Sequence, residues 1–317
     1  MAELTRTKTE LKDALSNLEG DVALVMTMGA LHDGHLSLVR AAREAAPNVV
    51  VSIFVNPLQF GPNEDFEAYP RDLEADLELL DTVGVDVVYA PEVEDVYPRT
   101  PLVRIDPGPV ATIFEGKTRP THSAGVLQVV HKVFNLVQPD VAFFGQKDAQ
   151  QLALIRTMVA DLDMPLEIRA VPIKREESGL AMSSRNTYLS EEEEIEALAL
   201  NQALVLGKDA AAHGATPAEA LDVALHYLSE APGVKLDYLA LVDPETFLDL
   251  TEEPKGSPED AGAGFQGSVM EDSGTQESGS EEVNEAATPT TKRGLLITAA
   301  WVGPTRLIDN MEVEFHG

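Results

Sequence analysis

Cysteine is absent from this chain of 317 residues, so a disulfide framework, a thiolate zinc site and a cysteine nucleophile are all excluded. No run of about eighteen apolar residues occurs, which excludes a transmembrane helix of ordinary length. The opening segment MAELTRTKTELKDAL is charged and helix-like, with neither an apolar h-region nor a cleavage site, and no signal peptide is expected. Together these absences favour a cytoplasmic protein.

Basic residues are scarce: Lys and Arg together number 23 against 54 acidic residues, which gives a formal net charge of -31. Such a chain repels nucleic acids and anionic membranes unless it carries a focused basic site, so neither is an expected partner. The acidity favours solubility, for example in a high-salt cell; the alternative is an acidic surface for a basic partner. An anionic substrate must therefore meet local positive charge, and the few basic residues become informative.

Strands and helices alternate through the first half of the chain. Apolar, β-branched runs predict strands, and apolar residues at helical spacing predict helices between them. Strands are predicted at residues 22–26, 49–55, 86–90, 141–144 and 167–171, and helices at 36–46, 68–83, 126–137 and 149–162. This alternation implies βαβ crossovers and therefore an α/β fold with a doubly wound, Rossmann-like parallel sheet. We place this first domain at residues 1–173.

The remainder, residues 174–317, predicts a smaller α+β domain. Ser190 followed by four glutamates is a strong helix start, with a capping hydroxyl and acids in the first turn. A second helix is predicted at 216–229, and strands at 235–242, 295–302 and 307–315. Residues 252–292 are rich in Gly, Ser, Pro, Thr and acids and lack apolar periodicity, which predicts a disordered insertion between two strands.

The turn after the first predicted strand of this sheet carries the motif Met28-Gly29-Ala30-Leu31-His32-Asp33-Gly34-His35. Ligands of open α/β sheets bind beyond the carboxyl ends of the strands, where helices begin. Gly34 permits a close approach of backbone to ligand, and the helix start offers free N–H groups to an anion. Both imidazoles can donate N–H groups to the oxygens of one phosphate. The alternatives for this motif alone are two ordinary surface histidines or half of a metal site.

Two further turns concentrate basic and hydroxyl side chains. Phe143-Phe144-Gly145-Gln146-Lys147-Asp148 ends another predicted strand, with a glycine, a lysine and an acid suited to ribose and phosphate contacts. Met182-Ser183-Ser184-Arg185-Asn186 lies in a loop, where two hydroxyls and a guanidinium suit a mobile triphosphate clamp. Taken singly, the first motif also fits a capped helix with a solvated Lys–Asp pair, and the second an ordinary loop. The basic residues Lys147, Arg185, Lys174 and Arg119 all lie in turns.

In this order on a doubly wound fold, the three turns resemble the nucleotidylyltransferase superfamily, in which an HxGH-type signature and a serine-rich loop hold ATP for attack on its α-phosphate. The resemblance is closer still to one family, the pantothenate synthetases (pantoate–β-alanine ligases), over nearly the whole chain apart from the insertion. It rests on the segments TMGALHDGHLSLVR, SIFVNPLQFGPNEDFEAYPR, TRPTHSAGVLQVV, FFGQKDAQQLALIR and GLAMSSRNTYLS. Several long motifs in the same order make it highly specific.

The resemblance implies an ATP-dependent ligase that joins pantoate to β-alanine through a pantoyl adenylate, releasing pyrophosphate and AMP, in pantothenate and coenzyme A biosynthesis. The residues it implies for catalysis are His35, His32, Lys147 and Arg185. The residues it implies for ATP binding are Met28, Gly29, Ala30, Leu31, His32, Asp33, Gly34, His35, Gly145, Gln146, Lys147, Asp148, Lys174, Met182, Ser183, Ser184 and Arg185. We expect His35 to stabilise phosphate charge more than to move a proton, because an ionised carboxylate attacks without proton transfer.

The acid substrate is implied to lie against amide side chains. Gln59 and Gln151 would bind pantoate, because amides offer both donors and acceptors to its hydroxyls and carboxylate. Met28 would pack on the gem-dimethyl group of pantoate, and Asn56 belongs to the same pocket wall. A relative on the same fold that activates another small acid is the nearest competing hypothesis, and Gln59 and Gln151 discriminate against it. A nucleotide-binding regulator with a dead site would lack the phosphate-binding side chains, and none is missing.

The family also implies Mg²⁺ on the ATP, bridging phosphate oxygens with at most one or two carboxylates. Asp76 matches a family carboxylate and is the acid we name as a metal ligand; the alternative is a solvated helix face. Glu115, Arg119 and His122 match family positions too. We expect Glu115 and Arg119 to organise a loop or a subunit contact in the homodimer that the family implies; the alternative is a direct substrate role. The histidines without a supporting motif, expected to be ordinary surface or core residues, are His131, His213, His226 and His316.

The chain departs from the family pattern at three places. Gln146 stands where an acid or a lysine is also common, and Ala149 replaces a frequent aromatic. Neither change removes a charge that the mechanism needs. The segment 252–292 is longer than the usual connection, and we expect it to be dispensable for catalysis.

Overall fold

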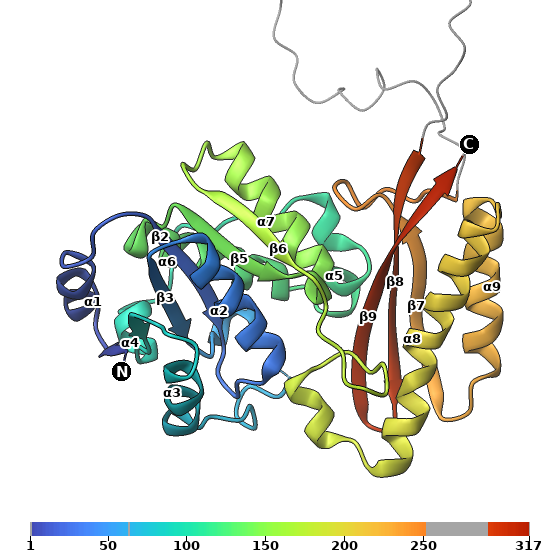
Figure 1. The fold of residues 1–317 in the computed structure, drawn as a ribbon, viewed down its shortest axis with the longest axis horizontal. Coiled ribbons are helices and arrows are strands. Elements are labelled where there is room, and N and C mark those ends of the chain that lie inside the picture. The colour runs from blue at the N-terminus through green and yellow to red at the C-terminus, as the bar shows by residue number, and fades with distance from the viewer. Residues whose placement is uncertain (1, 63, 252–290, 317) are drawn as a thin grey trace, which may run out of the picture.

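The computed structural model of the protein describes residues 2–62, 64–251 and 291–316. A parallel sheet with its helices and an antiparallel sheet with two long helices lie next to each other along the longest axis of the molecule (Figure 1). The predicted insertion lies outside the described residues except at its end. Thr291 and Lys292, which we had assigned to the insertion, already belong to strand β8, so that part of the prediction is wrong.

The larger sheet has six strands within the described residues, in the order β1-β4-β3-β2-β5-β6, and every neighbouring pair is parallel. Its strands are β1 (Glu3–Thr5), β2 (Val22–Thr27), β3 (Asn48–Ile53), β4 (Val87–Tyr89), β5 (Val141–Gly145) and β6 (Glu167–Val171). Adjacent residues of β2 enter two different cores: Leu24 packs into one and Val25 into the other. Because both faces of the sheet are buried, its central strands are continuously apolar, and the prediction of a doubly wound α/β fold is confirmed.

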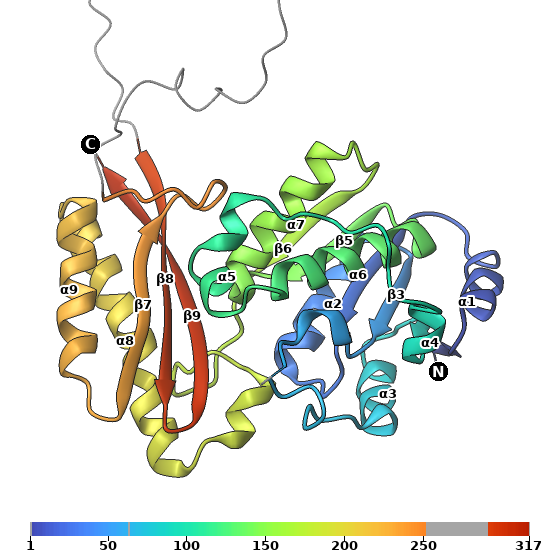
Figure 2. The same cartoon turned by 180° about the vertical axis from the view of Figure 1, so that it is seen from behind.

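Helices cover both faces of this sheet (Figures 1 and 2). One core joins the sheet to α1 (Lys8–Leu15), α6 (His122–Val137) and α7 (Ala149–Asp161), and the other joins it to α2 (Asp33–Ala45) and α3 (Leu73–Asp81). The shorter helical segments are η1 (Pro57–Gln59), α4 (Val93–Val96), η2 (Pro109–Thr112), α5 (Glu115–Thr118), η3 (Gln146–Asp148) and η4 (Ser184–Tyr188). No helix within the described residues combines the length and the apolarity needed to cross a bilayer.

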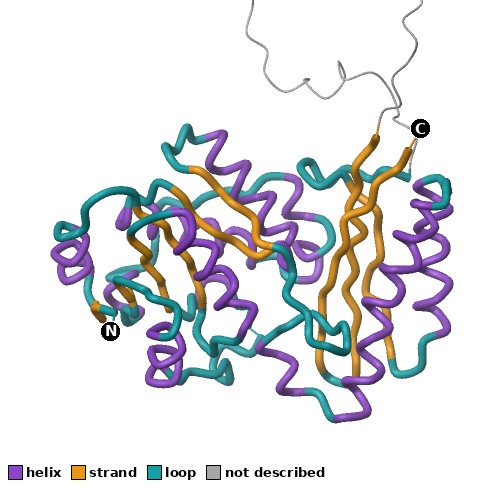
Figure 3. Tube along the Cα trace, viewed as in Figure 1, coloured by secondary structure: helices purple, strands orange, loops and turns teal. Residues whose placement is uncertain are grey.

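The smaller sheet is antiparallel and consists, in the part of the chain that is described, of β7 (Val234–Val242), β8 (Thr291–Val302) and β9 (Thr305–His316). Helices α8 (Glu191–Ala212) and α9 (Pro217–Glu230) cover one of its faces (Figure 3). The predicted start of α8 is confirmed, because Ser190 and Glu193 form a reciprocal capping box. Part of the other face packs against the first half of the chain through a core that includes Ala153 of α7 and Ile297 of β8.

Two element boundaries differ from the predictions for identifiable reasons. The helix-like opening contains a short strand, β1, which is too short to show a period and is recognised only through its pairing with β4. The helix predicted from residue 68 begins at Leu73, because Pro70 disfavours a helical residue before it and Asp72 caps the helix by accepting from the Ala75 N–H at 3.1 Å.

Candidate active site

The site is built at the point where the strand order of the parallel sheet reverses. From β2 the chain moves outward to β3 and β4, and β5 then inserts on the other side of β2. Ligands of open α/β sheets bind at such a switch point, beyond the carboxyl ends of the strands. Because Val25 of β2 lies opposite Phe143 of β5, the turns that follow these two strands are neighbours. They are the predicted histidine turn and the predicted turn at 145–148.

A buried carboxylate on α3 fixes the backbone of the histidine turn. Asp76 of α3 is 3 % exposed and accepts hydrogen bonds from the backbone N–H groups of Ala30 at 3.1 Å and Leu31 at 2.7 Å. Ala30 has a left-handed backbone (φ 51°), and Gly29 before it is left-handed too. A Cβ on Gly29 would lie 2.9 Å from the Asp76 carboxylate, so a larger residue there would push the acid away. Two hydrogen bonds to Asp76 and the close approach of Gly29 to its carboxylate therefore fix the turn.

The two histidines cap the helix that follows the turn. His32 is the N-cap of α2, and its Nδ1 accepts from the Gly34 N–H at 3.1 Å; Nδ1 of His35 accepts from the His32 N–H at 3.4 Å. The ring centroids are 4.1 Å apart. Since each Nδ1 accepts a hydrogen bond, each neutral ring carries its hydrogen on Nε2. The pair thus has two Nε2–H donors at a helix N-terminus, where an anion is favoured.

Both rings are held in the neutral form. Burial, together with the neighbouring His32, lowers the pKa of His35 to about 3. Burial lowers the pKa of His32 as well, and the nearby Lys147 ammonium adds to the effect. Around neutral pH the two imidazoles are therefore hydrogen-bond donors without a proton to give up easily.

The turn after β5 presents Lys147 and Asp148 to a cavity, while Gln146 points elsewhere. The Gln146 side chain donates to the Glu312 carboxylate of β9 at 3.0 Å. The Gln146 amide thus already binds the small sheet, and a contact of Gln146 with ATP stays a prediction. Within the described residues, Lys147 has no carboxylate at ion-pair distance, so its ammonium is available to an anionic ligand.

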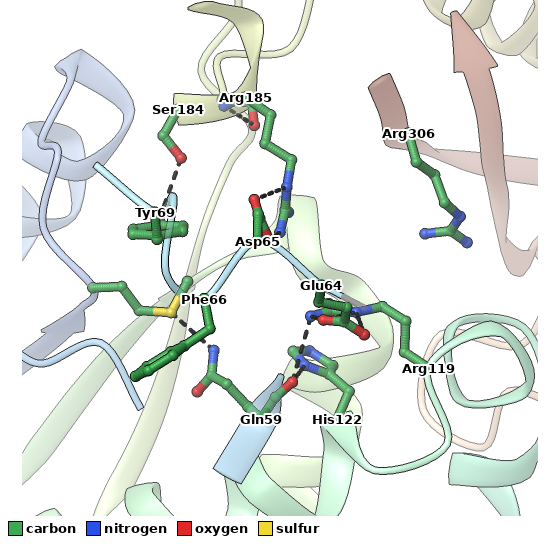
Figure 4. A network of polar contacts seen from close by, with 12 residues as sticks. Gln59, Glu64, Asp65, Phe66, Tyr69, Arg119, His122, Ser184, Arg185 and Arg306 are labelled. Carbon is green, nitrogen blue, oxygen red and sulfur yellow. Dashed lines mark hydrogen bonds and ion pairs between the residues drawn. The ribbon is translucent and has the colours of Figure 1, made fainter. Parts of the chain in front are cut away.

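The predicted clamp, residues 182–185, lies across the cavity from the parallel sheet. Ser183 caps the short helix η4 by accepting from the Arg185 N–H. Arg185 pairs with Asp65 at 3.1 Å, and Ser184 shares a hydrogen bond with Tyr69 at 3.3 Å (Figure 4). Met182 approaches the histidine turn: its Cβ is 3.7 Å from the position that a Cβ on Gly34 would take. The clamp and the first phosphate turn are therefore adjacent. Lys174, predicted to meet adenine through its backbone, accepts from the Met182 N–H through its carbonyl.

The predicted acid pocket has one wall whose amides bind one another. Gln59 is 7 % exposed; its Nε2 donates to the Met28 sulfur at 2.9 Å, and its Oε1 accepts from Asn56 at 3.1 Å. Asn56 in turn donates to the Gly125 carbonyl at 2.9 Å, so it fixes η1 against α6. Met28, Asn56 and Gln59 thus form a connected wall, as expected of a shared pocket. Gln151 lies on α7 and faces the cavity.

Three residues matching family positions organise the surrounding segments. Arg119 pairs with Glu64 at 3.1 Å from its Nε, and Nδ1 of His122 lies 3.1 Å from the Gln59 carbonyl (Figure 4). Burial and the neighbouring Arg119 lower the pKa of His122 to about 4. Glu115 pairs with Arg306 of β9, so it joins α5 to the small sheet. Both Glu115 and Arg119 therefore tie segments together in this structure.

A cavity of about 530 Å³ lies between the parallel sheet and the small sheet. Of the predicted site residues, those that line it are Lys147, Asp148, Gln151, Ser183 and Arg185. Its lining does not include His32, His35, Met28, Gln59 or Asn56; the two histidines of this group lie near the Lys147 ammonium. The predicted residues consequently form two adjoining groups, one at the switch point and one around the cavity, with Lys147 facing both.

Several residues around the cavity were not identified from the sequence: Glu64, Asp65, Tyr69, Arg175, Arg306, Asp309 and Asn310. One of them left a usable signal. Asp309 falls on the buried face of an alternating strand, between Leu307 and Val313, where an apolar residue is expected. A charge at such a position indicates a buried partner. The others are ordinary polar residues of loops and turns and gave no such signal.

Asp76, the predicted metal ligand, binds the backbone of the histidine turn in this structure. Both of its oxygens accept backbone N–H groups, and its burial raises its pKa against the effect of those bonds. No group of three or more His, Cys, Asp or Glu residues suited to holding a metal is found among the described residues. Asp76 is accordingly an anchor of the histidine turn, and its ligation of Mg²⁺ stays a prediction.

Known proteins resemble this chain over almost its full length. Residues 3–312 match the family model of pantoate–beta-alanine ligase. The pantothenate synthetase of Acidothermus cellulolyticus is 48 % identical over 311 residues, covering 98 % of this chain and 91 % of the relative. That of Thermobifida fusca is also 48 % identical, over 318 residues, covering 97 % of this chain and 94 % of the relative.

Solved structures agree with the same family. The pantothenate synthetase of Thermus thermophilus superposes with a TM-score of 0.81 at 42 % identity, covering 98 % of each chain. The pantoate–beta-alanine ligase of Francisella tularensis, complexed with beta-gamma ATP and beta-alanine, gives a TM-score of 0.71 at 29 % identity, covering 98 % of this chain and 97 % of that one. The matches extend through both sheets and through every turn described above. The chain belongs to the pantoate–beta-alanine ligase family.

Proposed function

We propose that this protein condenses pantoate with β-alanine at the expense of ATP, giving pantothenate, AMP and pyrophosphate. The observation that carries the proposal is the meeting of three features at the switch point and its adjoining cavity, in a chain of this family: two neutral imidazoles, a lysine without an ion-pair partner among the described residues, and a serine–arginine loop. We also propose two functional units, residues 1–173 for binding ATP and pantoate and residues 174–317 as a lid.

In the first step a carboxylate oxygen of pantoate attacks the α-phosphorus of ATP, and the bond from that phosphorus to the pyrophosphate oxygen breaks. Charge rises on the phosphate oxygens during this step, so donors already fixed in place lower its barrier. We assign His32 and His35 to these oxygens through their Nε2–H groups. Lys147 and Arg185 neutralise the triphosphate charge, with Ser183 and Ser184 beside them. Because His35 is neutral and the attacking carboxylate is ionised, no proton has to move.

The remaining nucleotide contacts are assigned to backbone. The turn from Met28 through Leu31 into Asp33 and Gly34 offers N–H groups at the start of α2, and Gly145 with Asp148 would hold the ribose. Lys174 would meet adenine through its backbone. Gln146 is assigned through its backbone alone, since its side chain binds Glu312.

The pantoate pocket is assigned to the connected wall and the facing helix. Gln59 and Gln151 would bind the hydroxyls and the carboxylate, and Met28 would cover the gem-dimethyl group. In the second step the β-alanine amine attacks the acyl carbon of the adenylate: the C–N bond forms, the C–O bond to AMP breaks, and the amine loses a proton. Exclusion of water from the cavity would protect the reactive anhydride in the meantime.

Mg²⁺ would enter with ATP and would supply charge neutralisation at its phosphates, with Asp76 as the carboxylate predicted to ligate it. A homodimer is proposed on the family relationship, and the mass measured by light scattering on the full chain would test it.

The test of the reaction is pyrophosphate release from ATP. We expect release that depends on pantoate, continues to one equivalent per site without β-alanine, and turns over when β-alanine is added. No pantoate-dependent pyrophosphate in either case would refute the assignment. Release with another small acid in place of pantoate would favour the alternative, a related adenylate-forming enzyme on the same fold.

A further inference from the structure

Strand β9 of the small sheet contacts both segments that are proposed to hold the triphosphate. Asn310 is 5 % exposed, and its Nδ2 donates to the carbonyls of Gln146 and Lys147, at 2.9 Å each. These carbonyls belong to η3, the turn that carries Lys147. A single buried amide therefore uses both of its hydrogens to fix the backbone on which the unpaired ammonium stands.

The preceding residue of β9 fixes the other segment. Asp309 is 4 % exposed and binds Arg175 with both oxygens, at 2.7 and 2.9 Å. Arg175 pairs across a tight hairpin with Ala181 and donates to the Gly179 carbonyl at 3.2 Å. Met182 follows that hairpin directly and begins the clamp. Asp309 also accepts from the backbone N–H of Asn310 at 2.7 Å, so its carboxylate fixes the backbone that carries the Asn310 amide.

We propose that Asp309 and Asn310 are positioning residues, which set the Lys147 turn and the Met182–Arg185 clamp at the separation that ATP requires. Neither residue needs to touch the nucleotide, because each acts on the backbone of a segment that does. The assignment rests on the proposed function of the site and adds that the small sheet, through one dipeptide, places the phosphate groups for reaction.

The chain offers a matched control for this idea. Asn48 is 8 % exposed, and its Nδ2 likewise donates to backbone carbonyls, those of Glu19 at 2.8 Å and Asp21 at 3.2 Å. It opens β3 and therefore lies at the amino end of the sheet, opposite the site. Asn310→Leu and Asn48→Leu each remove a buried amide donor of the same kind. Both should lower the midpoint of thermal unfolding, and only the first should affect the nucleotide site.

The experiment measures binding of a non-hydrolysable ATP analogue by calorimetry, and pantoate-dependent pyrophosphate release, on the full-length variants. For Asn310→Leu we expect binding weakened about tenfold and release slowed about thirtyfold, with the KM for pantoate within about threefold because Gln59 is held elsewhere. For Asn48→Leu we expect both within about twofold of the unmodified protein. Equal losses in the two variants, or none in Asn310→Leu, would overturn the proposal.

A double-mutant cycle separates positioning from general loosening. In a Lys147→Met background, Asn310→Leu should cost less than about threefold in analogue binding, because the group it positions is already gone. An undiminished tenfold loss there would overturn action through Lys147. If the unmodified protein binds the analogue but releases no pyrophosphate with pantoate, the proposed function fails, while the binding comparison still decides the positioning role.

Discussion

The histidine turn and the serine–arginine clamp are proposed to hold the same molecule, yet they are built in opposite ways. The turn is fixed through backbone: Asp76 binds two N–H groups, and the histidines cap their own helix. The functional side chains of the clamp have partners that a ligand can replace, since Arg185 binds Asp65 and Ser184 binds Tyr69, both from the segment after η1. One half of the site is preformed, and the other must exchange partners.

This difference separates two tasks of an adenylating site. Donors that stabilise a transition state act best when they are already in place, so the turn is rigid. Basic side chains that bind and release ATP can pair with a protein carboxylate while no nucleotide is bound. The carboxylate keeps them ordered until ATP takes its place. The ion pair of Arg119 with Glu64 repeats that of Arg185 with Asp65, and the two acids are neighbours in the segment after η1.

The largest effect is expected from breaking the rigid half. Asp76→Ala leaves two N–H groups without their acceptor, which should lower the free energy of unfolding by about 3 kcal/mol and slow pyrophosphate release by more than about a hundredfold. Urea unfolding and the release assay measure the two effects. Asp76→Asn, which retains one acceptor oxygen, should lie between. A variant of unchanged stability that merely needs more Mg²⁺ would instead support metal ligation.

Removing a donor while the turn stays intact should have a purely kinetic effect. His35→Ala should slow adenylation about a hundredfold to a thousandfold, with the unfolding midpoint little changed near neutral pH. Single-turnover pyrophosphate release measures the rate. His213→Ala is the control, since His213 is exposed at the end of α8 and its loss should leave the rate unchanged. Equal rates in the two variants would remove His35 from the reaction.

A fall in pH should destabilise the histidine turn before the clamp. The folded pKa of His35 is about 3 and the ordinary histidine pKa is 6.5, so the unfolded state binds the proton more readily. The stability contributed by neutral His35 is complete above pH 6.5 and is lost as the pH falls toward 3, by about 1.4 kcal/mol per pH unit at most. The difference in unfolding free energy between the unmodified protein and His35→Ala should therefore shift toward the variant from pH 7 to pH 5. A constant difference would contradict this.

Removing the acid that pairs with the clamp arginine should improve ATP binding. Asp65→Asn removes the anion that competes for Arg185, and we expect the KM for ATP to fall about fivefold, as loss of a partly exposed ion pair of about 1 kcal/mol implies. Steady-state kinetics at varied ATP measure it. Glu78→Gln changes the net charge equally on the exposed side of α3 and should leave the KM within about twofold. A raised KM in Asp65→Asn would mean that Asp65 supports the site.

The smallest effect is expected from the segment between β7 and β8. The segment 252–290 connects β7 to β8, which are antiparallel neighbours with Val242 opposite Leu295. Replacing it by a short Gly–Ser linker should leave turnover within about threefold, because neighbouring strands can be joined by a short loop. The pyrophosphate assay with β-alanine present measures turnover. A hundredfold loss with the fold intact would show that the segment serves the site.

The parallel sheet and the histidine turn could be predicted because their information is local. An apolar run such as the one forming β3 is buried on both faces wherever it pairs, and His32 caps the helix three residues before His35. The serine–arginine clamp could be recognised as a motif, but its contacts with distant segments could not be predicted. Tyr69 and Ser184 are 115 positions apart, and no pattern in either segment indicates the other. Asp76 illustrates the same limit. Its place on a helix is predicted correctly, but its partners are two backbone N–H groups, which no pattern of side chains reveals.

The net charge of -31 should affect how fast ATP binds. The cavity cannot offset this charge with its arginines, because Arg119, Arg185 and Arg306 are already paired with acids. ATP approaches as an anion toward an anion, with Lys147 the nearest attraction. Dissolved salt shortens the range of that repulsion to about 8 Å at physiological ionic strength. Encounter with the nucleotide should consequently become faster as salt is added, the reverse of the usual behaviour of nucleotide enzymes with basic clefts. A surface that hinders its own substrate in dilute buffer is suited to a concentrated electrolyte.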